Sequence, residues 1–363
     1  MTTSPRSSSG RTFTQKTPAT DLPPAAGHPV LQRAEEVALR FGGLLPAEAL
    51  REAGVPPHSL RRLCGEGVLH GIRRGVYVAG AQWRAADTGE RYRLLVRATV
   101  LTAGNSPVLS HHSAAVLHGL PIIGAWPATV HTLMPGSGRG STARFTTSHN
   151  GPTSEVVEDI DGCRVTPLAR TLVDVAATSS FLVAVTMVDH ALRVEQERVL
   201  REQLRRGDVP PMPERPALTK EDLYWELDRV NPRTGRRHVE RAIEFASPLA
   251  ANPGETLSRV RIFQLGFAAP ELQVRFPDIL GGNAYVDFFW RRVRKIGEFD
   301  GFLKYGAGAV LGDRDPSTVV WQEKQREDAL RARVKSFDRW GWDLALAPGR
   351  FHAFLTERGV PRA

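Results

Sequence analysis

Two short apolar segments in the C-terminal third of the chain each carry acidic residues. The first, Ala284–Trp290, contains Asp287, and the second, Lys295–Phe299, contains Glu298 and is followed by Asp300. Segments rich in aromatic and β-branched residues, separated by a short break, predict neighbouring β-strands. Carboxylates on adjacent strands can converge, so these two segments constrain both the fold and the chemistry.

Helical and strand patterns alternate around this pair of predicted strands. Apolar residues recur at helical spacing before it, and Gly281-Gly282-Asn283 predicts a turn into its first strand. The order is helices, three strands, a helix and a last strand, which makes an α/β sandwich. The expected ranges are helices at 219–230, 234–245, 256–265 and 317–337, and strands at 272–276, 284–290, 295–299 and 342–346.

The acidic residues suit a hard divalent cation. Mg²⁺ prefers oxygen ligands and keeps several waters, so two or three converging carboxylates suffice to hold it. Asp287 and Glu298 are the expected ligands, and Glu255, near the start of the preceding helix, is expected to be the third. The positive end of a helix also tolerates a negative charge there.

This C-terminal region resembles the PD-(D/E)XK nuclease superfamily, and within it the very-short-patch-repair-like endonucleases. The similarity rests on Gly254-Glu255-Thr256-Leu257-Ser258-Arg259, Leu272-Gln273, Asp287 and Glu298-Phe299-Asp300-Gly301. It implies a restriction-endonuclease-like α/β domain in which Asp287, Glu298 and Glu255 bind Mg²⁺ or Mn²⁺. Asp300 stands where the superfamily motif has a lysine, so Lys304 or Gln273 is expected to take part of that role.

The first ordered part of the chain predicts a winged helix-turn-helix. Helical patterns over 30–43, 46–53 and 58–66 precede two short strands around a basic turn, within 68–78. A third helix of this kind fits the DNA major groove, and the turn can lie on flanking phosphate. The expected contacts with double-stranded DNA are Arg61, Arg62, Arg73 and Arg74. The alternative is a protein-docking module with a polar turn.

Two stretches here are similar to the AbiEi family of abortive-infection antitoxins. They are the run from Arg61 through Arg73-Arg74-Gly75-Val76-Tyr77-Val78 and the run Leu109-Ser110-His111-His112-Ser113-Ala114-Ala115-Val116-Leu117-His118-Gly119-Leu120. The resemblance implies a DNA-binding regulator that often represses its own operon.

The region that follows is expected to be mixed α+β. Ser110 is expected to cap a helix ending near Gly119, and Asp161-Gly162 to turn a hairpin within 154–167. His111 and His118 lie on roughly one helix face, but no acid accompanies them at metal-ligand spacing. We therefore interpret these histidines as a helix cap and packed imidazoles.

Composition sets the remaining expectations. At 363 residues the chain predicts several domains, and the formal charge of +9, mostly from arginine, favours a nucleic-acid partner. Two cysteines exclude a cysteine zinc site. No apolar run is long enough to span a bilayer, and the N-terminal segment has no apolar core of a signal peptide. We therefore expect a cytoplasmic bacterial protein that does not associate with a membrane.

The expected organisation is therefore a multidomain α/β protein. Its parts are a disordered tail (1–28), a winged helix-turn-helix (29–80), an antitoxin-like α+β middle domain (81–200), a linker (201–217) and a restriction-endonuclease-like domain (218–363). The expected function is DNA binding with Mg²⁺-dependent hydrolysis of phosphodiester bonds. The alternatives are an AbiEi-like repressor with a degenerate nuclease fold and a module that binds a toxin-type partner.

Overall fold

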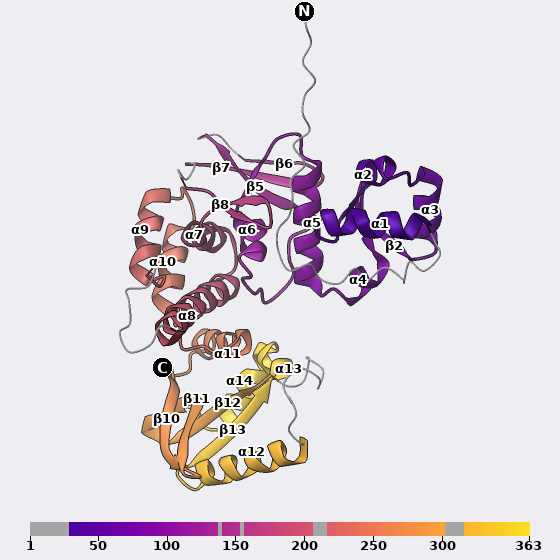
Figure 1. Ribbon diagram of the computed structural model, residues 1–363. Helices are drawn as coiled ribbons and strands as arrows, with labels where there is room; N and C mark the ends of the chain where they lie inside the picture. The colour runs from indigo at the N-terminus through magenta and orange to yellow at the C-terminus, as the bar shows by residue number, and fades with distance from the viewer. Residues whose placement is uncertain (1–28, 137–139, 153–155, 206–215, 302–315) are drawn as a thin grey trace, which may run out of the picture. The chain divides into compact units, whose positions relative to one another are not determined.

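A computed structural model describes residues 29–136, 140–152, 156–205, 216–301 and 316–363, in which helices accompany three β-sheets (Figure 1). The expected disordered tail lies outside these residues. The chain divides into two compact units, the first made of 1–120, 124–175 and 226–231 and the second of the remainder. No helix in the described ranges is long and apolar enough to cross a membrane.

The first unit begins with helices and a small antiparallel sheet of order β1-β3-β2. Leu45, Leu50 and Leu60 are buried together in its core, because apolar residues recur at helical spacing in the flanking segments. Gly75, with φ of 80°, turns the hairpin at the basic dipeptide that the sequence predicts. The elements are α1 (Pro29–Arg40), β1 (Leu45–Pro46), α2 (Ala47–Glu52), α3 (Pro57–Gly65), β2 (Leu69–Arg73) and β3 (Val76–Ala79).

A six-stranded mixed sheet of order β6-β7-β5-β4-β9-β8 forms the rest of the first unit. The hairpin predicted at Asp161-Gly162 is present, and both residues have positive φ, as a type I′ turn requires. Ser110 precedes α6 but makes no side-chain cap; its hydroxyl contacts the His111 ring instead. The elements are α4 (Gly80–Ala85), α5 (Thr88–Thr102), β4 (Val108–Leu109), α6 (His111–Leu117), β5 (Val130–Pro135), β6 (Ser141–Thr142), β7 (Thr146–Gly151), β8 (Glu158–Ile160), β9 (Cys163–Val165) and α7 (Leu168–Thr178).

The division between the units differs from the expected linker at 201–217. Helix α8 (Phe181–Arg205) continues through the first residues of that range and belongs to the second unit. The physical reason is Asp189, which is 1% exposed and accepts hydrogen bonds from Thr256 Oγ1 at 2.8 Å and Arg259 Nη1 at 2.7 Å. A buried carboxylate with these partners ties α8 to the helix that carries Thr256 and Arg259. Residues 206–215 of the expected linker lie outside the described residues.

The second unit is built on a four-stranded sheet of order β10-β11-β12-β13, in which only β12 and β13 run parallel. Leu330 of α12 packs on one face of the sheet with Val286 and Ile296. Leu257 of α11 packs on the other face with Phe288 (Figure 1). Helix α9 (Lys220–Val230) is divided between the two units, since its residues from Glu226 onward belong to the first. The other elements are α10 (Arg236–Phe245), α11 (Pro253–Gln264), β10 (Glu271–Ile279), β11 (Gly282–Trp290), β12 (Lys295–Asp300), α12 (Pro316–Arg331), β13 (Ser336–Gly341), α13 (Trp342–Ala345) and α14 (Pro348–Glu357).

The end of the sheet corrects the predicted helix at 317–337 and the predicted strand at 342–346. Helix α12 stops at Arg331, the last strand is Ser336–Gly341, and Trp342–Ala345 is a short helix. Phe337 and Trp340 are buried in the cores on opposite faces of the sheet, so this strand alternates faces although its sequence is largely polar. Tertiary burial of two aromatic residues outweighs the helical appearance of the segment.

Candidate functional site

Asp287 lies where strands β11 and β12 separate. The ladder between them covers Trp290↔Lys295, Phe289↔Ile296 and Phe288↔Gly297, and ends there. Beyond that point Asp287 Oδ2 accepts a hydrogen bond from the Phe299 backbone N–H at 2.8 Å. The Asp287 carboxylate thus accepts the hydrogen bond that a backbone carbonyl would accept if the two strands stayed paired. Because the strands separate here, the carboxylate is partly exposed at the edge of the core.

Glu255 reaches this point from the first turn of α11. Asn252 caps that helix by accepting from the N–H groups of Gly254 and Glu255. The Glu255 carboxylate turns back and accepts from Ala251 N–H at 2.8 Å and from Asn252 Nδ2 at 2.6 Å. Although Glu255 is only 4% exposed, its position at a helix N-terminus supplies donors for a buried charge.

Gln273 joins the two carboxylates. Its Nε2 donates to Glu255 Oε2 at 3.2 Å and to Asp287 Oδ1 at 3.3 Å. The residue has a φ of 48°, which is uncommon for a side chain other than glycine, asparagine or aspartate. The regular β10 pairs Leu272↔Phe288 and Val274↔Val286 flank it, so an irregular backbone position turns its amide toward the acids.

Electrostatics in this cluster favour a proton or a cation. Burial, and then the negative charge of Asp287, raise the pKa of Glu255 to about 7. Burial also raises the pKa of Asp287. Two neighbouring carboxylates whose ionised forms are disfavoured are hard oxygen donors for a divalent ion, so Glu255 and Asp287 fit Mg²⁺ or Mn²⁺.

Glu298 is differently placed from the other two acids. Its Oε1 accepts from Arg326 Nη2 at 2.9 Å, and its Oε2 accepts from Arg339 Nη2 at 3.1 Å. Burial raises the pKa of Glu298, and the charge of Arg326 opposes that change. Both carboxylate oxygens therefore have arginine partners, which compete with a metal for this predicted ligand.

Arg339 is a residue of this site that the sequence did not indicate. It lies opposite Glu298 in the parallel pair of β12 and β13 and also pairs with Glu323 of α12. Because the sequence pattern placed the last strand at 342–346, Arg339 fell outside every predicted element of the sheet. An arginine in register with the second acid could have been found only by locating this strand correctly.

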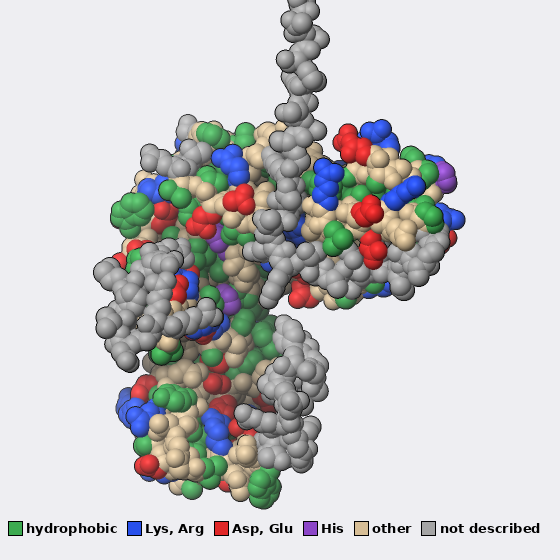
Figure 2. All heavy atoms as spheres, viewed as in Figure 1, with side chains coloured by type: hydrophobic (Ala, Val, Ile, Leu, Met, Phe, Trp, Pro, Cys, Tyr) green, Lys and Arg blue, Asp and Glu red, His purple; other side chains and the backbone are tan. Residues whose placement is uncertain are grey.

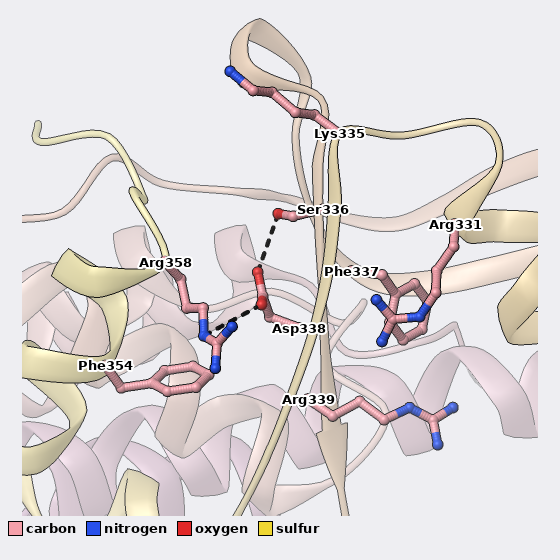
Figure 3. Close-up of a pocket in the computed structure, with 8 residues that line it drawn as sticks. All are labelled: Arg331, Lys335, Ser336, Phe337, Asp338, Arg339, Phe354 and Arg358. Carbon is pink, nitrogen blue, oxygen red and sulfur yellow. Dashed lines mark hydrogen bonds and ion pairs between the residues drawn. The ribbon is translucent and has the colours of Figure 1, made fainter.

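A pocket of about 360 Å³ lies along β13, with Arg339 on one side of the strand and Asp338 on the other (Figure 3). Asp338 accepts from Ser336 Oγ at 3.1 Å and pairs with Arg358 at 3.6 Å. Arg339 pairs with Glu298, whereas Arg358 lies with Asp338 on the opposite side of the strand (Figure 3). The pocket is lined by Arg331, Lys335, Ser336, Phe337, Asp338, Arg339, Phe354 and Arg358.

Asp300 and Lys304 complete the predicted acid site. Asp300 is the last residue of β12, pairs with Gly341 and is half-buried. Residues two apart on a strand share a face, so Asp300 lies on the same side of the strand as Glu298. Lys304 lies outside the described residues. In the described part of the chain no lysine contacts Glu255, Asp287 or Glu298.

The four arginines expected to contact DNA are not equivalent. Arg61, Arg62 and Arg74 are exposed, and Arg62 lies 3.7 Å from Glu66. Arg73 instead lies over the Phe145 ring at 5.6 Å, and burial lowers its pKa. Its Nε and Nη1 atoms are buried and have no hydrogen-bond partner among the described residues. Arg73 is therefore a packing residue more than a surface contact.

Basic and acidic side chains are interspersed over the N-terminal helices on the face shown in Figure 2. DNA contact there would depend on particular arginines, since that face has no continuous basic surface. Helices α1 to α3 contain five arginines and four glutamates, so little of the net charge of +9 lies on them.

Comparisons with known proteins show a likeness to a solved structure. No protein-family model matches the chain, and no curated protein matches it. Among solved structures, the chain is similar to the RV2827C protein from Mycobacterium tuberculosis, with 16% identity and a TM-score of 0.36. The similarity covers 66% of this chain and 83% of that protein.

Proposed function

We propose that this chain binds double-stranded DNA and hydrolyses its phosphodiester bonds with Mg²⁺ or Mn²⁺ held by Glu255 and Asp287. The observation that carries the proposal is the pair of buried carboxylates joined by Gln273, with the Glu255 pKa raised to about 7. A bound divalent ion supplies an activated water and offsets charge on the phosphate. Glu298 is the third acid of the set, with its charge shared with Arg326 and Arg339.

The chain's own groups have separate roles in this proposal. Gln273 keeps the two carboxylates together, and the Phe299 N–H fixes the orientation of Asp287. Glu255, whose pKa lies near neutrality, can exchange its proton for a bound cation at physiological pH. Arg326 and Arg339 place positive charge beside the acids, where it can stabilise a phosphate oxygen.

The first unit is proposed to hold the DNA. Helix α3, followed by the β2–β3 hairpin, is the order of elements used by a winged helix-turn-helix. Arg61 and Arg62 are exposed on α3, and Arg74 is exposed at the hairpin turn. Planar guanidinium groups at those positions suit bidentate contact with phosphate.

Plasmid cleavage with matched acid variants tests the enzymatic proposal. Supercoiled plasmid is incubated with purified protein and Mg²⁺ or Mn²⁺, and with Asp287→Asn and Glu255→Gln. We expect nicking by the wild type and its loss in both variants. The control is Glu271→Gln, because Glu271 is an exposed acid of β10 paired with Arg291, outside the cluster. Wild-type protein that leaves the plasmid intact with both ions refutes the activity.

A second candidate is a DNA-binding repressor, antitoxin-like in type, that does not cut. The observations that favour it are the two arginines on Glu298 and the presence of Asp300 where the superfamily motif has lysine. It predicts affinity for DNA that falls linearly in log salt, with no cleavage by wild type in either metal. Electrophoretic mobility shifts run beside the cleavage assay distinguish the two candidates.

A further inference from the structure

Three histidines from separate parts of the first unit meet at one place. His111 begins α6, His131 lies on β5 and His149 lies on β7. Their candidate ligand nitrogens all lie within 4.8 Å of one another. His149 Nε2 is 2.9 Å from His131 Nδ1, and the rings of His111 and His149 stack with centroids 3.6 Å apart.

The sheet brings His131 and His149 together. Strands β5 and β7 are parallel, and Leu133 pairs with His149. His131 precedes Leu133 by two residues and therefore shares its face of the sheet. The start of α6 is fixed beside them, because Ser110 N–H donates to the His131 carbonyl at 3.1 Å and His131 N–H donates to Ser113 Oγ at 2.8 Å.

His111 is held in a costly conformation. Its φ is 50°, and a non-glycine residue in this region carries backbone strain of about 1 kcal/mol or more. The ring is 5% exposed, with Nδ1 at 3.0 Å from Ser110 Oγ and 4.0 Å from Asp174 Oδ2. Asp174 is in turn paired with the buried Arg170. These contacts involve Nδ1, so Nε2 is the ring nitrogen of His111 that remains to bind a metal ion.

The electrostatic state of the cluster suits coordination. Burial, and then the neighbouring histidines, lower the pKa of His111 well below its ordinary value. Burial, and then His149, lower the pKa of His131 to about 3, and burial lowers the pKa of His149. The imidazoles are therefore neutral at physiological pH, which is the form that binds metal.

We propose that His111, His131 and His149 bind a single divalent transition-metal ion of the Zn²⁺ type. Imidazole nitrogen suits zinc, whereas Mg²⁺ prefers oxygen, so this site is chemically distinct from the acidic cluster of the second unit. Two nitrogens on one tetrahedral zinc lie about 3.3 Å apart, close to the separation of His131 and His149. The partly exposed His131 and His149 rings give the ion a route to the site, and water completes its coordination.

The consequence of binding is a link between α6 and the β5–β7 pair. An ion that binds only the folded arrangement stabilises it in proportion to metal concentration. The Ser110 hydroxyl, 3.0 Å from His111 Nδ1, is the outer partner that would orient this imidazole. The site is independent of the proposed nuclease activity, because none of its residues belongs to the acidic cluster.

Metal titration of the full chain tests this proposal. Chelator-treated protein is titrated with Zn²⁺ by calorimetry and with Co²⁺ by visible absorption. We expect one equivalent per chain, with Co²⁺ bands of a nitrogen-ligated tetrahedral ion. His131→Gln and His149→Gln should each weaken binding at least about tenfold. Circular dichroism checks that each variant is folded. The test remains valid if one of the two variants does not fold, because the other can still be measured.

Two controls sharpen the result. His58→Gln removes an exposed histidine of α3, and Asp287→Asn removes an acid of the other cluster; both should bind Zn²⁺ as the wild type does. Protein that takes up no stoichiometric Zn²⁺ or Co²⁺ overturns the proposal and makes the cluster a packing feature. Unchanged binding in both folded histidine variants, or loss of binding in Asp287→Asn, overturns it equally.

Discussion

Gln273 and Glu255 show how single residues set the charge of the acidic cluster. Glu255 accepts from Ala251, Asn252 and Gln273, and these hydrogen bonds favour its ionised form. Burial and the charge of Asp287 act in the opposite direction and prevail, so the pKa of Glu255 rises to about 7. The cost of ionising this group is the free energy that a bound cation would recover.

A pH dependence of stability follows at the residue scale. Because the folded pKa of Glu255 exceeds its ordinary value of 4.5, the folded state binds more protons between pH 4.5 and about 7, and stability falls as pH rises through that window. The difference corresponds to up to about 3 kcal/mol. We therefore expect Glu255→Gln to gain stability relative to wild type between pH 5 and 8, as measured by urea unfolding followed by tryptophan fluorescence.

Glu271→Gln provides the matched comparison for this titration. Glu271 is exposed and paired with Arg291, so its removal should leave the pH slope of stability close to that of the wild type. A difference between wild type and Glu255→Gln that stays constant from pH 5 to 8 would contradict the raised pKa.

At the scale of elements, the acidic site depends on close contact between α11 and β12. A Cβ atom added at Gly254 would lie 1.9 Å from Phe299 Cε1, so only glycine lets the helix start pack on this ring. Phe299 is also the residue whose N–H orients Asp287. The position of Asp287 is thus linked to a glycine in a different element.

Gly254→Ala should separate α11 from β12. We expect it to destabilise the protein by about 1–3 kcal/mol through overpacking and to weaken cleavage with it. Gly349→Ala is the control, because Gly349 also follows the first proline of a helix and an added Cβ there meets nothing within 4 Å. Equal denaturation midpoints for the two variants would show that the close contact of Gly254 with Phe299 does not determine the stability of the protein.

The β2–β3 hairpin offers a second prediction for an element. Arg74 is exposed, whereas Arg73 lies on Phe145. Arg74→Ala should lower the slope of log affinity against log salt by about 1, as expected for the loss of one phosphate contact. Arg73→Ala should leave that slope unchanged and cost about 0.5–1 kcal/mol of stability. Fluorescence anisotropy of labelled duplex DNA at several salt concentrations decides between them, and reversed effects would place Arg73 on the DNA.

At the scale of the whole molecule, the proposed DNA-binding arginines and the acidic cluster belong to different compact units. Changes in sites that share no residues usually add in free energy. We expect the combined variant Arg74→Ala and Asp287→Asn to bind DNA as Arg74→Ala does and to fail in cleavage as Asp287→Asn does. Binding isotherms and plasmid assays on all three proteins measure this, and non-additive affinity would show that the acids also hold DNA.

The sequence predicted most of the elements because they depend on local signals. Alternating apolar residues located β11 and β12, and Asp161-Gly162 located the hairpin of the first unit. The same signals failed at β13, whose polar sequence becomes a strand only because Phe337 and Trp340 are buried on opposite faces. Secondary structure that depends on distant packing cannot be found from a local pattern.

The sequence by itself determined which acids could gather, since Glu255, Asp287 and Glu298 lie in consecutive patterned elements. Only the tertiary structure decided that Gln273 joins two of them and that Arg326 and Arg339 neutralise the third. The same holds for His111, His131 and His149, which are far apart along the chain and meet through parallel pairing of β5 and β7. The sequence specifies which side chains are present at each position. Their burial, their charged partners and the geometry of their hydrogen-bond and metal-donor atoms arise only when distant segments pack.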